Sequence, residues 1–71
     1  MNERQLQSKI GIRIKKIRLK KGMTQSQLAT ECNFQRSGIS RIESGQRNLT
    51  VNNIYKISKA LEVPISELFK D

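Results

Sequence analysis

Apolar side chains recur at steps of three or four residues along most of this chain, and this spacing is its strongest constraint on the fold. Between residues 6 and 21 the apolar positions are Leu6, Ile10, Ile14 and Ile17. A helix gathers such positions on one face, whereas a strand would alternate apolar and polar residues. The pattern predicts an amphipathic helix that buries this face in a core. A membrane-surface helix is the lesser alternative, because the apolar stripe is narrow and contains no Trp or Phe.

Capping residues define a second, short helix. Gly22 follows the basic end of the first helix and suits a left-handed C-cap, because it has no Cβ to clash with the backbone. Thr24 is a favourable N-cap, and Gln27 can return a hydrogen bond to the Thr24 backbone, which makes a capping box. These residues predict a helix from about residue 25 to residue 31.

A tight turn and a third helix are expected next. Asn33 tolerates a positive φ angle better than most residues, so residues 32–35 are predicted to turn. The third helix begins near Arg36 and stops at Gly45. Gly38 inside it is a weakness of about 1 kcal/mol relative to alanine. We favour the interpretation that Gly38 is tolerated there over the alternative that it allows the backbone to approach a partner closely.

Two further helices complete the prediction. Thr50 can cap a fourth helix, whose apolar stripe ends before Pro64. Proline disfavours helical geometry at the preceding residue but suits the first turn of a new helix, so residues 65–69 are expected to form a short fifth helix. With no repeats or linkers, the sequence predicts one compact all-α domain of five helices over residues 1–71.

The basic residues are unevenly distributed. The chain has 14 Lys and Arg against 6 Asp and Glu, a net charge of +8. Residues 1–50 contain 11 basic and 3 acidic side chains, while residues 51–71 contain 3 of each, so the whole excess lies in the first part. A one-sided positive field attracts a polyanion, and nucleic acid is therefore the leading partner. An anionic membrane surface and a charge that serves solubility alone are the alternatives.

The chain lacks the residues that several classes of function require. The chain has no His, no nucleophile beside a base and no Gly-rich phosphate loop, so we expect no enzyme, no cofactor and no metal. Cys32 is the only cysteine, which excludes an intramolecular disulfide, and we expect it to be a small buried residue. No apolar run approaches the roughly 20 residues of a membrane span, and the N-terminus has no apolar signal-peptide core. We therefore expect no membrane contact and a cytoplasmic location.

The second and third helices have the arrangement of a helix-turn-helix, in which a short turn joins two short helices. The second helix of such a unit enters the major groove of DNA, and its outward face must avoid bulky apolar groups. Here that face offers Arg36, Ser37, Ser40 and Arg41. Because arginine can contact guanine through two hydrogen bonds, Arg36 is our first choice for base reading.

The stretch GMTQSQLATECNFQRSGISRIESGQRNLT, residues 22–50, resembles the lambda-repressor-like helix-turn-helix family. The flanking IKKIRLKKG and IYKISKALEVPISELF extend the match over nearly the whole chain. Within that family, the segments KKIRLKKGMTQ, QRS and RNLT most resemble the controller proteins of restriction-modification systems. The resemblance implies a transcription regulator that binds a palindromic double-stranded DNA operator as a homodimer. A phage or plasmid repressor and an antitoxin-like protein-interaction module of the same fold are the alternatives.

The resemblance also implies roles for individual residues toward DNA. Arg36, Ser37, Ser40 and Arg41 match positions that reach base edges. Gln25 is expected to contact a phosphate, and Arg47 the DNA backbone near the operator centre. Weaker backbone contacts are expected from Asn48, Asn52 and Asn53.

Arg18 and Glu43 correspond to a pair that joins the first helix to the end of the recognition helix, which implies a structural role. The C-terminal apolar residues are more numerous than one small core needs, and we expect Val63, Ile65 and Leu68 at the dimer interface. RNA polymerase is a further expected partner. Activation or repression depends on where the operator lies relative to a promoter, which no residue encodes.

Overall fold

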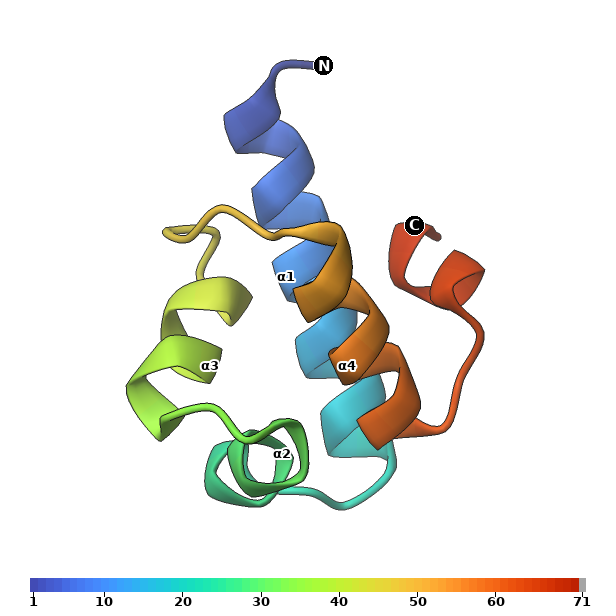
Figure 1. Cartoon of the computed structure of the whole chain (residues 1–71). Coiled ribbons are helices and arrows are strands. Elements are labelled where there is room, and N and C mark those ends of the chain that lie inside the picture. Colours follow the sequence, from blue (N-terminus) through green and yellow to red (C-terminus); the bar gives the residue numbers. More distant parts are fainter. Residues whose placement is uncertain (71) are drawn as a thin grey trace.

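The computed structural model describes residues 1–70, which form four α-helices and one 3₁₀ helix (Figure 1). These elements are α1 (Glu3–Lys20), α2 (Gln25–Cys32), α3 (Arg36–Glu43), α4 (Val51–Leu61) and η1 (Ile65–Phe69). The prediction of an all-helical fold is confirmed, but the prediction of a fifth α-helix is wrong. The Glu67 amide donates to the Pro64 carbonyl at 3.0 Å, three residues back. That spacing defines a 3₁₀ turn, a form common in pieces this short.

α1 is the longest helix and runs along the length of the domain (Figure 1). It contacts α3 and η1, while α2 contacts α3 and α4. The largest fully buried side chains are all aliphatic, and every element contributes at least one: Ile14, Leu28, Ile39, Ile42, Ile57, Leu61 and Leu68. Burial of one such side chain stabilises a fold by roughly 1.5–3 kcal/mol. No helix can therefore leave the domain without exposing part of the core.

The ends of α2 and α4 follow the capping signals of the sequence. Thr24 Oγ1 accepts a hydrogen bond from the Gln27 amide at 3.0 Å, and Gln27 Oε1 accepts one from the Thr24 amide at 2.7 Å, so the predicted capping box is confirmed. Thr50 Oγ1 accepts from the Asn53 amide at 3.0 Å and caps α4. Asn33 adopts the predicted left-handed conformation with φ 58°. The local signals were therefore sufficient to place these ends.

α1 begins at Glu3, before the first apolar residue of its stripe. Asn2 and Gln5 form a second capping box, with hydrogen bonds of 3.0 Å and 2.8 Å between the side chain of each and the backbone amide of the other. Apolar periodicity does not register such a polar cap, so the sequence prediction started this helix too late.

α1 and α3 approach each other closely at Gly11. A Cβ on Gly11 would overlap the carbonyl oxygen of Ile42 and would lie 2.8 Å from that of Glu43. The absence of a side chain lets the C-terminal end of α3 rest on the α1 backbone. This contact fixes the direction in which α3 projects from the domain.

Candidate nucleic-acid interface

α2 and α3 form one unit through a turn over residues 33–35. The Phe34 amide donates to the Ala29 carbonyl at 2.8 Å, which closes the end of α2 around the left-handed Asn33. Leu28 of α2 and Ile39 of α3 are both fully buried in the same core cluster. The two helices are therefore joined both by backbone hydrogen bonding and by packing.

α3 has a buried apolar face and an exposed polar one. Ile39 and Ile42 have no exposed surface. Of the four predicted base-reading residues, Ser40 is half-buried, and the exposed ones are Arg36, Ser37 and Arg41. This face offers guanidinium and hydroxyl donors with no bulky apolar group between them, which suits the edges of base pairs in a major groove.

Arg47, in the loop after α3, folds back over that helix. Its guanidinium carbon lies 5.8 Å from the centroid of the Phe34 ring, and a Cβ on Gly38 would lie 2.7 Å from Arg47 Nη1. The aromatic ring attracts the cation, and glycine leaves the space that the cation occupies. The missing side chain of Gly38 thus leaves the space in which Arg47 Nη1 lies, a contact that neither sequence-based interpretation of Gly38 anticipated.

This arrangement brings Arg47 to the recognition face. Arg47, Ser37 and Arg41 line one surface hollow. Lys56 of α4 adds a further cation, with its Nζ 5.6 Å from the centroid of the same Phe34 ring. The positive charge at the N-terminal half of α3 therefore comes from three parts of the chain, and the sequence alone does not reveal this.

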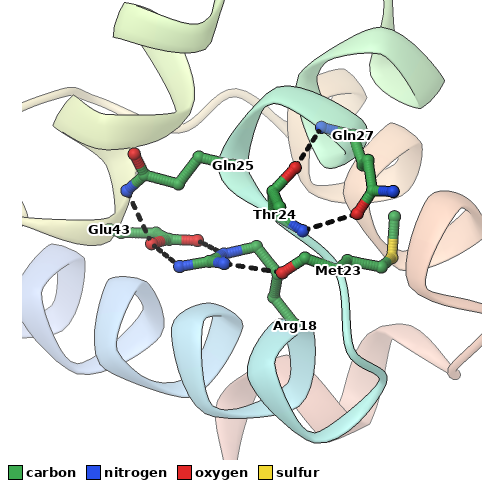
Figure 2. Close-up of polar contacts among 6 residues, drawn as sticks. All are labelled: Arg18, Met23, Thr24, Gln25, Gln27 and Glu43. Atoms are coloured by element: carbon green, nitrogen blue, oxygen red, sulfur yellow. Dashed lines mark hydrogen bonds and ion pairs between the residues drawn. The ribbon is translucent and has the colours of Figure 1, made fainter.

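A buried ion pair holds α1, α2 and α3 together (Figure 2). Arg18 Nε donates to Glu43 Oε2 at 2.6 Å, and Arg18 Nη2 donates to Glu43 Oε1 at 3.0 Å. Arg18 Nη1 also donates to the Met23 carbonyl at 2.8 Å, and Gln25 Nε2 donates to Glu43 Oε1 at 3.1 Å. Arg18 and Glu43 are only 5% and 7% exposed, so these hydrogen bonds replace the water that both charges lose.

Gln25 occupies the first position of α2 and is half-buried. Its bond to Glu43 fixes the side-chain amide at the edge of this network (Figure 2). An amide nitrogen carries two hydrogens, so the contact to Glu43 leaves one donor available.

The three asparagines expected at the DNA backbone lie in different settings. Asn52 is exposed in the first turn of α4, and Asn53 is half-buried there. Asn48 is exposed in the loop, and its Oδ1 accepts a hydrogen bond from Gln7 Nε2. Asn48 thus ties the loop after α3 to the beginning of α1.

The three residues expected at a dimer interface differ in their exposure to solvent. Leu68 has no exposed surface and belongs to the core of its own domain, so it cannot touch a second subunit directly. Val63 is half-buried against that core, whereas Ile65 is 40% exposed. The assignment of Leu68 to an interface is therefore wrong, because η1 turns this side chain inward.

Other apolar side chains are exposed in this part of the molecule. Val51 is 79% exposed and Tyr55 is 51% exposed, one helical turn apart on α4. Leu6 and Phe69 are also exposed, and together with Ile54 they line a groove between α1, α4 and η1. Spacing along a helix does not show which edge of an apolar stripe faces solvent, so the sequence did not single out Val51.

Cys32 is 3% exposed, at the end of α2. Burial and the charge of Glu31 raise the pKa of its thiol to about 11, although Lys56 acts in the opposite direction. Its thiol is therefore neutral and packed, as expected for a structural cysteine. Within residues 1–70 there is no cluster of three potential metal ligands, and no helix combines the length and apolarity needed to cross a bilayer.

Comparison with known proteins also identifies a helix-turn-helix. Residues 14–68 match the helix-turn-helix family. The chain is 49% identical over 59 residues to the control protein C.BamHI of Bacillus amyloliquefaciens, covering 82% of this chain and 73% of that protein. The crystal structure of the restriction-modification controller protein C.AhdI from Aeromonas hydrophila has a TM-score of 0.85 and 39% identity, covering 87% of this chain and 94% of the other. The wild-type controller protein C.Esp1396I has a TM-score of 0.83 and 50% identity, covering 90% and 83%.

Proposed function

The chain belongs to the helix-turn-helix family of DNA-binding transcription regulators, and we propose that it binds a palindromic operator as a homodimer and controls a restriction-modification system. The exposed polar face of α3 is the observation that carries this proposal. It presents Arg36, Ser37 and Arg41 to solvent while Ile39 and Ile42 anchor the same helix in the core. We assign the protein no catalytic activity, and we place it in the cytoplasm with its DNA.

We assign the contacts with base edges to α3. Arg36 lies in the first turn of the helix, where a long side chain can reach a base pair in the major groove. Its guanidinium can donate two hydrogen bonds to O6 and N7 of guanine. Ser37 and Arg41 extend the contact along the exposed face, and Ser40 contributes from its edge.

Phosphate contacts fix the position of α3 in the groove. Gln25 donates one amide hydrogen to Glu43 and offers the other to a phosphate at the start of α2. Arg47 is held against α3 by Phe34 and supplies a cation beside the base-reading residues. Asn52 is exposed at the start of α4 and can add a contact there. Asn48 and Asn53 are weaker candidates, because Asn48 already binds Gln7 and Asn53 is half-buried.

A second copy of the chain would cover the apolar surface of α4 and η1. Val51, Tyr55, Ile65 and Phe69 are exposed there. Residues 51–71 carry no net charge, so two copies can approach through this end without the repulsion that the basic first part would create. A two-fold dimer would place two recognition helices about 34 Å apart, one turn of DNA. Palindromic operators follow from that symmetry.

The role in restriction-modification rests on the relatives. C.BamHI, C.AhdI and C.Esp1396I are controller proteins, and each matches most of this chain. Adjacent genes for a restriction endonuclease and a methyltransferase are the expected setting, and contact with RNA polymerase at their promoter is part of the proposal. A chromosomal setting without those genes would favour the phage or plasmid repressor of the same fold.

Selection of bound duplexes from a random-sequence pool tests the proposed DNA recognition. We expect enrichment of a palindrome, bound by two protein chains, with an affinity at least about a thousandfold above that for random duplex at physiological salt. Recovery of unrelated sequences bound with equal affinity would contradict sequence-specific recognition. That result would favour the antitoxin-like module, whose main partner is another protein.

A further inference from the structure

Basic residues are concentrated in and just after α1, and fewer of them lie on the recognition helix. Of the 14 basic residues, eight lie between residues 4 and 21. Arg18 is paired with Glu43, and Arg13 with Glu67 at 3.4 Å. Among the others, Lys15, Lys16 and Lys20 are exposed and take no part in the DNA contacts proposed above.

Two exposed apolar side chains accompany these lysines. Ile12 is 53% exposed and Leu19 is 58% exposed. They are seven residues apart, which places them on the same side of α1 about 10 Å from each other. Lys15 and Lys16 lie between them, each three or four positions from both. We call Ile12, Lys15, Lys16 and Leu19 the outer α1 surface.

The outer α1 surface lies away from the packed side of the helix. The α1 residues buried within the domain are Ile10, Gly11, Ile14, Ile17 and Arg18. A hollow of about 510 Å³ extends this surface toward the N-terminus, with Ile12 and Lys16 in its wall together with Arg4 and Lys70. No residue of α2 or α3 lines that hollow, so the recognition helix is not part of it.

We propose that the outer α1 surface docks an acidic peptide segment of a partner protein. Two apolar side chains of the segment meet Ile12 and Leu19, and its carboxylates meet Lys15 and Lys16. Each apolar contact removes exposed hydrocarbon from water, and each carboxylate approaches an exposed lysine. Arg4 extends the positive field into the hollow and orients the segment along α1, whereas Lys70 in the same wall is paired with Glu67.

Neither DNA nor a second copy of the chain fits this surface as well. Phosphates can neutralise the lysines, but they leave Ile12 and Leu19 in contact with water. A second copy would bring two chains of charge +8 together through their basic sides. A partner with alternating acidic and apolar side chains satisfies both features. The docked segment lies away from α2 and α3. The segment can therefore bind while α3 lies in the major groove of DNA.

A fluorescein-labelled acidic peptide tests the proposal directly. The probe is a helical peptide with two leucines seven residues apart and glutamates on the flanking positions. A control peptide has the same charge but carries glutamine in place of both leucines. Fluorescence anisotropy at physiological salt measures binding of each peptide to the full chain. We expect the leucine peptide to bind about tenfold more tightly than the control peptide.

Protein variants locate the contact. The double variant Ile12→Gln, Leu19→Gln and the single variant Lys16→Glu should each weaken the leucine peptide about tenfold, because they remove the apolar and the charged half of the site. Lys59→Glu, an equal charge change at an exposed position of α4, should have a much smaller effect. Circular dichroism of each variant establishes that the helices are intact.

Two outcomes would overturn the proposal. Equal binding of the two peptides would show attraction by charge alone, without use of Ile12 and Leu19. Displacement of the leucine peptide by excess random-sequence duplex would show that nucleic acid occupies the same surface. The expected result is that the labelled peptide stays bound when that duplex is added.

Discussion

The guanidinium of Arg47 lies over Gly38, in the space that a Cβ at that position would claim. The hypothetical Cβ would be 2.7 Å from Arg47 Nη1, and the guanidinium also faces the Phe34 ring at 5.8 Å. A glycine in the recognition helix thus admits a cation from the following loop. Arg47 of the loop after α3 therefore adds a positive charge to the recognition face at Gly38, where α3 itself has no side chain.

Replacement of Gly38 by alanine should separate stability from DNA binding. Alanine favours a helix by up to about 1 kcal/mol over glycine, and the flexible Arg47 can move aside, so the free energy of unfolding should rise or stay unchanged. DNA binding should weaken because Arg47 leaves its place. Urea unfolding and duplex titration measure the two effects. In an Arg47→Ala background the same substitution should no longer weaken binding, and a loss of equal size there would refute the role of Arg47.

Arg36→Ala should lower specific binding by about 1–3 kcal/mol while changing binding to random duplex little, because a bidentate contact to guanine is lost. Arg47→Ala should instead weaken binding to all sequences and reduce the salt dependence, because it removes a backbone contact. Titrations of the selected operator and of a random duplex at several salt concentrations compare the two variants. Equal losses on both duplexes for Arg36→Ala would exclude Arg36 from base reading.

Glu43→Gln should cost about 3–5 kcal/mol of the free energy of unfolding, since it leaves the Arg18 guanidinium buried without a charged partner. The double variant Arg18→Met, Glu43→Leu should recover part of this loss, because it removes both buried charges and replaces them with apolar side chains. Urea unfolding of the wild type and these variants gives the comparison. A loss below about 1 kcal/mol for Glu43→Gln would place this pair among the weak surface ion pairs.

Val51→Glu should convert a dimer into monomers without loss of stability. Val51 is 79% exposed in the first turn of α4, where an acidic side chain favours the helix. At a two-fold contact, the introduced carboxylates of the two subunits would lie near each other, and their repulsion would weaken the dimer. Sedimentation equilibrium in the absence of DNA measures the change, and Asn52→Glu at the neighbouring position is the matched control. Dimers of unchanged affinity in Val51→Glu would show that subunits meet elsewhere.

Cys32 should resist thiol reagents at neutral pH while the protein is folded, because the side chain is buried and its pKa is raised to about 11. The raised pKa means that the folded state holds this proton more tightly than the unfolded state. Its contribution to stability is therefore present below the pKa of the unfolded thiol and is lost as the pH rises through about 11. Reaction with an aromatic disulfide reagent, followed with and without denaturant, checks this. Rapid and complete reaction of the folded chain at neutral pH would contradict the burial.

Signals that act within a few residues were readable in the sequence. Thr24 with Gln27, Thr50 and Asn33 mark the helix ends that the structure shows, because each satisfies or directs the backbone only one turn away. The predicted turn over residues 32–35 in turn placed the start of the recognition helix near Arg36, where the structure also has it. The apolar period likewise separated the buried Ile39 and Ile42 from the exposed face of α3.

The sequence by itself thus determined the helices, the position of the helix-turn-helix and the excess of positive charge, since propensity, capping and composition are local properties. Only the tertiary structure decided that Leu68 is buried while Val51 is exposed, that Gly38 accommodates Arg47, and that Lys15 and Lys16 lie on the side of α1 away from the core. These relations depend on how separate helices pack against one another. A spacing of three or four residues describes one helix and carries no information about its neighbours.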